Sequence, residues 1–168
     1  MTSRLWPFLH RSAPKKAVWL LLATCPLYFS SANAGLNFSS CSVSLTGINF
    51  GTVDPMSDDL ATSTVTVTCT ITGNGSAISL PIVLTTGSGS FTTRTLKSGT
   101  NFLNYNIYTD SARSIIWGNG IGGTSTSTVS VSFSSSGSQS ATLFGKIPSQ
   151  PKAIPGTYND TITASVTY

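Results

Sequence analysis

The chain has 168 residues, with nine Lys and Arg residues against five Asp residues and a formal net charge of +4. Four of the basic residues and the only histidine, His10, lie within the first sixteen positions, whereas the first acidic residue is Asp54. From Gly35 onward, five basic and five acidic residues balance, and neither His nor Glu occurs. These are the side chains most used for acid–base and metal chemistry, so we expect no enzyme, metal site, cofactor or small-molecule substrate. The five basic residues are scattered, which argues against a nucleic-acid partner.

The first 34 residues are typical of a cleaved signal peptide. A basic segment, residues 1–16, precedes an apolar run, residues 17–29, that is shorter than the ~20 residues needed to span a bilayer. Ala32-Asn33-Ala34 then has the small-x-small pattern that signal peptidase accepts. We therefore predict cleavage after Ala34 and a mature domain of residues 35–168. Cleavage nearer Ala23 or Ser30 is the alternative, and an uncleaved anchor is disfavoured by the short apolar run.

Two cysteines, Cys41 and Cys69, remain after this cleavage. An even pair in an exported chain predicts one disulfide, and the alternative is two separate thiols. The bond would close a loop of about 28 residues and stabilise the fold by about 3.5 kcal/mol in the chain-entropy description.

Apolar residues alternate with Ser and Thr, which make up about a third of residues 35–168. This period of two predicts half-buried strands, with both cysteines on core-facing positions. The final strand has Ile162, Ala164, Val166 and Tyr168 on its inner face. No stretch has a sustained helical repeat, so we predict a single all-β domain, a β-sandwich. The expected strands are residues 41–45, 64–71, 78–85, 103–108, 129–133, 141–147 and 161–168.

Two patterns imitate functional motifs. Residues 118–123 match the glycine spacing of a dinucleotide-binding loop, but a Ser/Thr run follows where a helix is required, so we expect a tight loop. Asp54, Asp58 and Asp59 do not have the spacing of a calcium loop. We expect them in a solvated loop, where Asp54 opens a turn with Pro55.

Several short motifs occur in a consistent order along the mature chain. They are Cys41-Ser42-Val43, Ile48-Asn49-Phe50-Gly51, Asp54-Pro55, Val65-Thr66-Val67-Thr68-Cys69, Arg94-Thr95-Leu96, Leu103-Asn104-Tyr105-Asn106-Ile107-Tyr108, Trp117-Gly118-Asn119-Gly120 and Gly156-Thr157-Tyr158-Asn159-Asp160. Together they resemble the spore coat protein U domain family, the subunits of archaic chaperone–usher pili.

The resemblance implies an immunoglobulin-like sandwich that lacks its last strand. In that family a periplasmic chaperone fills the resulting groove with its own strand, and a sibling subunit's N-terminal extension later replaces it. The chain stops after residues 161–168, so we expect Ile162, Ala164, Val166 and Tyr168 to line the groove and contact the chaperone. An ordinary edge strand in a complete sandwich is the alternative. An outer-membrane usher and sibling pilus subunits are the other implied partners, at the surface of a Gram-negative bacterium.

The segment before Cys41 is short for a strand donor. Only Leu36 and Phe38 alternate as donor residues should. The chain is thus expected to be a structural pilus subunit, or alternatively a tip adhesin or secreted coat protein with no donor role. Residues 86–91 and 117–124 are the candidate adhesive loops.

Overall fold

The computed structural model of the chain describes residues 37–72, 77–131 and 137–168. These residues form eight strands and no helix, which confirms the all-β prediction. In the same residues there is consequently no helix that could cross a bilayer. The strands are β1 (Asn37–Leu45), β2 (Asp59–Thr72), β3 (Ile78–Leu84), β4 (Arg94–Ser98), β5 (Asn101–Tyr108), β6 (Ser127–Val131), β7 (Gly137–Ile147) and β8 (Ala164–Val166).

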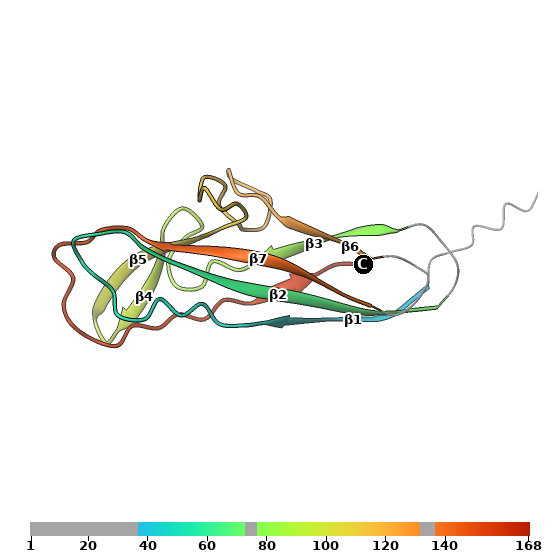
Figure 1. Cartoon of the computed structure of the whole chain (residues 1–168), viewed down its shortest axis with the longest axis horizontal. Helices are drawn as coiled ribbons and strands as arrows, with labels where there is room; N and C mark the ends of the chain where they lie inside the picture. The colour runs from blue at the N-terminus through green and yellow to red at the C-terminus, as the bar shows by residue number, and fades with distance from the viewer. Residues whose placement is uncertain (1–36, 73–76, 132–136) are drawn as a thin grey trace, which may run out of the picture. The chain divides into compact units, whose positions relative to one another are not determined.

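The strands form two antiparallel sheets (Figure 1). The larger has the order β1-β2-β7-β5-β4, and the smaller has the order β6-β3-β8. The long β2 and β7 pair from Asp59–Ile147 to Cys69–Gly137 and make the centre of the larger sheet. The predicted β-sandwich is therefore confirmed.

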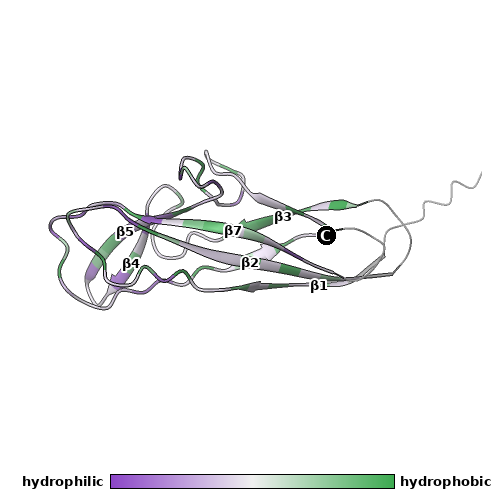
Figure 2. Cartoon of the chain, viewed as in Figure 1, coloured by the Kyte–Doolittle hydropathy of each residue, from purple (hydrophilic) through white to green (hydrophobic). Residues whose placement is uncertain are grey.

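The core lies between the sheets and follows the predicted alternation. On β2, Val65, Val67 and Cys69 are buried while Thr68 and Thr70 are exposed. Figure 2 shows apolar residues along β3, which supplies the opposite wall of the core, and in the middle of β7, which lies beside β2 in the larger sheet. All the buried apolar residues except Leu103 form one cluster, made of Val65, Val67, Cys69, Leu80, Ile82, Leu84, Tyr105, Ile107, Trp117, Val129, Val131, Leu143 and Ile147.

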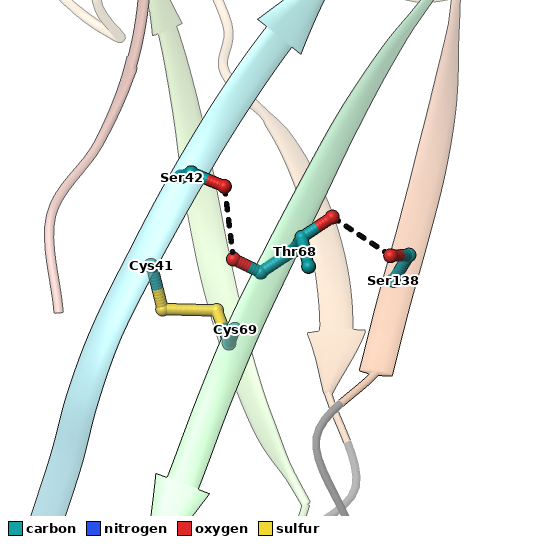
Figure 3. Close-up of a disulfide and its surroundings, with 5 residues drawn as sticks. All are labelled: Cys41, Ser42, Thr68, Cys69 and Ser138. Carbon is teal, nitrogen blue, oxygen red and sulfur yellow. Dashed lines mark hydrogen bonds between the residues drawn. A yellow bond between two sulfur atoms is a disulfide. The ribbon is translucent and has the colours of Figure 1, made fainter.

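The predicted disulfide joins Cys41 to Cys69 (Figure 3). The two residues are directly opposite each other in the β1–β2 ladder, so the bond ties the edge strand to its neighbour. On the other face of the sheet, in the β2–β7 ladder, Thr68 Oγ1 and Ser138 Oγ lie 2.7 Å apart, which extends the polar contacts to β7. The disulfide therefore anchors β1 from the core side.

Several strand predictions differ from the structure, and β1 and β7 each begin four residues before the predicted start. Strand β4 was not predicted, because Arg94 is its buried end and the remaining residues lack apolar alternation. Strand β2 begins at Asp59, within the predicted solvated loop. Regular pairing of the last strand covers only Ala164–Val166, opposite Leu84–Ile82 of β3. Part of the predicted strand 129–133 lies outside the described residues.

Candidate docking groove at the open edge of the sandwich

Strands β1 and β8 are edge strands of the two sheets. Among the described strands, β1 pairs only with β2 and β8 pairs only with β3, and the two edges lie near each other. Their inward residues, including Val43, Leu45, Ala164 and Val166, are only half-buried although they pack on the core. The core is therefore incompletely covered along this side of the sandwich.

Two cavities open between the segment that follows β1 and the segment that precedes β8, and together we call them the edge groove. One, of about 300 Å³, lies between residues 45–50 and Ile162 and reaches the core residues Ile107 and Leu143. The other, of about 740 Å³, continues between residues 48–55 and 153–160. Both are lined by Ile48, Phe50, Leu96 and Asp160. The edge groove thus gives access to side chains that belong to the centre of the fold.

The four residues predicted to line the groove differ in their position relative to the edge groove. Ile162 lines the smaller cavity, whereas Ala164 and Val166 on β8 are half-buried against the core and line neither cavity. Tyr168, expected as a fourth inward residue, has 55% of its surface exposed, because pairing with β3 ends at Val166. A groove role for these four residues stays a prediction.

The predicted donor residues precede or begin β1. Leu36 lies outside the described residues. Phe38 belongs to β1, where it is opposite Ile71 of the same chain. A donor role for Phe38 would therefore require it to leave its own ladder.

The wall of the edge groove that follows from the end of β1 was not predicted from the sequence. It consists of Leu45, Ile48, Phe50 and Leu96. The alternation of Ile48 and Phe50 could have indicated an inward face. However, Gly47 stands where the alternation that includes Leu45 would place the next apolar residue, so Ile48 and Phe50 are out of phase with that strand. Phe50 packs edge-on against Tyr105, with ring centroids 6.3 Å apart. That packing joins the missed wall to the floor of the groove.

Asp160 lies where both cavities meet and also lines a third one beside Thr86. Its Oδ2 accepts a hydrogen bond from the Tyr105 hydroxyl at 2.6 Å, and its Oδ1 accepts one from the Ser88 amide at 2.8 Å. Gly87 has a φ of 60°, and a Cβ there would meet the Asp160 carboxylate and approach Ile162 Cδ1 to 2.7 Å. The loop after β3 is thus closely fitted to Asp160. Burial, reinforced by the bond to Asp160, raises the pKa of Tyr105.

Tyr105→Phe is expected to lower the free energy of unfolding by about 1.5–3 kcal/mol at neutral pH, because a hydrogen bond to a charged carboxylate is lost. A raised pKa means that this contribution is complete below the usual tyrosine value of about 10 and decreases as the pH rises above it. Urea titrations from pH 7 to 11 should show the wild type losing stability above pH 10 more steeply than the variant. Parallel curves would contradict this assignment.

A second polar cluster surrounds Arg94, whose side chain is fully buried. Its guanidinium donates to Asn106 Oδ1 at 2.6 Å, to the Trp117 carbonyl at 2.8 Å and to the Thr85 carbonyl at 3.0 Å. Arg94 Nε is the one buried side-chain nitrogen or oxygen without a hydrogen-bond partner in the part of the chain that is described. Burial lowers the pKa of Arg94. The cluster links the ends of β3, β4 and β5 to the segment that carries Trp117.

The two predicted adhesive loops differ in exposure. Residues 117–124 form the expected tight loop, with positive φ at Gly120, Gly122 and Gly123 and with 72% of Ile121 exposed. In residues 86–91, Phe91 is half-buried and its ring lies 5.5 Å from the Arg94 guanidinium. An adhesive role for either loop stays a prediction.

The aspartates near β2 have structural partners. Asp54 accepts hydrogen bonds from the Met56 amide and the Ser57 hydroxyl, as the predicted turn requires. Asp58 forms an ion pair with Lys146 at 2.6 Å, which with hydrogen bonding lowers the pKa of Asp58. In the described ranges, no three metal-ligating side chains gather into a group that could hold an ion.

Comparisons with known proteins identify relatives of this chain. The Spore Coat Protein U domain matches residues 31–165. Protein U of Myxococcus xanthus is 29% identical over 168 aligned residues, which cover 88% of this chain and 91% of that protein.

A solved structure resembles the fold. It is the pre-assembly complex of the chaperone CsuC with the tip adhesion subunit CsuE, from the archaic chaperone–usher Csu pili of Acinetobacter baumannii. The likeness has a TM-score of 0.50 and 22% identity, and it covers 77% of this chain. It covers 39% of the matched chain, so this chain spans less than half of that chain's length. At this identity the likeness supports the two-sheet fold alone.

Proposed function

This chain belongs to the Spore Coat Protein U domain family, and we propose that it is a structural subunit of a surface pilus assembled by a chaperone and an usher. The observation that carries the proposal is the edge groove, whose floor includes the core residues Ile107 and Leu143. The chaperone–subunit complex that shares the fold supports it. In this proposal residues 1–34 direct export and are removed, and assembly takes place in the periplasm.

The proposed activity is capture of a β-strand. A strand laid between β1 and β8 would satisfy backbone groups on both edges, and its alternate apolar side chains would fill the two cavities. The chaperone would supply that strand first, and a sibling subunit would supply it in the fibre after delivery to the usher. Such capture needs no catalytic residue, which fits a mature chain without His or Glu.

Phe38 belongs to β1 and is paired with Ile71 of β2, which favours a subunit that accepts a strand and donates little. Such a subunit suits the tip of a fibre, because nothing lies beyond it to be completed. The exposed loop that carries Ile121 would then be a candidate contact with the target surface.

A coat protein is the second candidate function. It is favoured by the similarity to Protein U, which extends over 91% of that protein. Mass spectrometry of the exported chain would help to place the subunit. A start at Gly35 supports a tip or coat protein, whereas a start about ten residues earlier supports a shaft subunit with a longer donor segment.

The proposal is tested by co-expression with the cognate chaperone. Val166→Asp places a charge on the core-facing side of β8 and is expected to abolish co-purification with the chaperone. Ser165→Asp is the matched control, because its side chain is exposed on the opposite face of the same strand, and it should leave capture intact. Val166→Thr, which preserves the side-chain shape, should retain partial capture. Normal capture of the Val166→Asp chain would overturn the proposal.

A further inference from the structure

We infer that the strand which enters the edge groove carries one Ser or Thr among its inward apolar side chains, and that Asp160 selects it. The inference rests on the proposed function, because it assigns a preference to the strand captured there. The starting observation is that this carboxylate lies at the junction of both cavities, which are otherwise lined largely by apolar side chains.

The hydrogen bonds that Asp160 accepts within the fold do not use all the acceptor positions of its carboxylate, and the remaining ones would lose water once a strand covers the groove. Each carboxylate oxygen accepts one described hydrogen bond, from Tyr105 and from Ser88. A carboxylate has about four acceptor positions, so about two face the groove or solvent. A captured strand would displace water from these positions, and an apolar side chain there would leave them unpaired at a cost. A hydroxyl donor would replace the lost water.

Charge argues for a neutral donor. The buried Arg94 guanidinium attracts Asp160, so the strand does not have to supply the only positive charge that this carboxylate senses. An acidic side chain would be repelled and would also be desolvated. A short hydroxyl side chain suits a cavity of about 300 Å³ that also has to accept the neighbouring apolar residues of the strand.

The test uses labelled twelve-residue peptides and the purified mature chain. The parent peptide has Val at every inward position and Ser at every outward position. In the test peptides a single inward Val is replaced by Thr, which has nearly the same shape, or by Glu. Fluorescence polarisation gives the Kd of each. We expect Thr at one inward position to bind about tenfold more tightly than the parent, and Glu at that position to bind at least about tenfold more weakly.

Asp160→Asn and Asp58→Asn are the matched variants. Asp160→Asn removes the charge and half of the acceptor capacity, so it should remove most of the Thr advantage while it still binds the all-Val parent, and that binding also shows that the variant is folded. Asp58→Asn alters a surface ion pair outside the groove and should retain the Thr advantage. If no peptide binds any form of the chain, strand capture and this inference both fail. The inference alone is overturned if the parent peptide binds but Thr lowers the Kd at no inward position. It is also overturned if the tighter binding of the Thr peptide persists in Asp160→Asn.

Discussion

Replacing Arg94 with alanine is expected to lower the free energy of unfolding by about 3–5 kcal/mol. The change leaves a cavity and removes the donor from the buried Trp117 carbonyl, which costs about 1–3 kcal/mol when unpaired, and from the part-buried Thr85 carbonyl, which costs less. Asn106 Oδ1 keeps a bond from the Ile107 amide, so its loss is smaller. Urea titration followed by fluorescence measures the effect, because Trp117 is buried and is the only tryptophan after the predicted leader.

Two variants separate this effect from a general loss of charge. Lys97→Ala lies on the same strand with an exposed side chain and should change stability by less than about 1 kcal/mol. Arg94→Met keeps much of the volume and removes the desolvated cation, so it should fall between Arg94→Ala and wild type. Equal stability of Arg94→Ala and Lys97→Ala would show that the cluster does not hold the sheets together.

Loss of the Cys41–Cys69 bond is expected to destabilise the mature chain by about 3.5 kcal/mol. The bond closes a loop with a sequence separation of 28 residues and holds β1, whose last residue Leu45 lines the edge groove, against β2. Thermal unfolding with and without dithiothreitol should show a much lower Tm after reduction, provided that the reductant reaches the bond. Labelling of free thiols should confirm that reduction occurred.

The double variant Cys41→Ala, Cys69→Ala is the control for this experiment. It should unfold at about the temperature of the reduced wild type, and dithiothreitol should not change it. If strand capture is the function, this variant should also bind the chaperone more weakly, because β1 is no longer tied to its neighbour. A variant as stable as the oxidised wild type would show that pairing of β1 and β2 alone fixes the edge.

The fold could be predicted from the sequence wherever alternation was clean. The Thr-separated Val65, Val67 and Cys69 indicated both a strand and its inner face, and the same logic placed Cys41 on a core-facing position, which the structure sets opposite Cys69. Strand β4 escaped prediction because a buried Arg94 begins it, and a charged residue is ordinarily expected outside. The burial of Arg94 is explained only by the hydrogen-bond acceptors of Asn106, Thr85 and Trp117, which lie on three other segments.

The sequence by itself determined the all-β class, the inner faces of most strands, the disulfide and the family. These properties arise from neighbours in the chain with a period of two, or from motifs of a few residues. Only the tertiary structure decided that β8 stops at Val166, that residues 45–50 form the second groove wall, and that Asp160 meets Tyr105, 55 positions earlier. The physical reason is that unpaired edges and shared cavities depend on which distant strands pair, and local alternation does not specify that pairing.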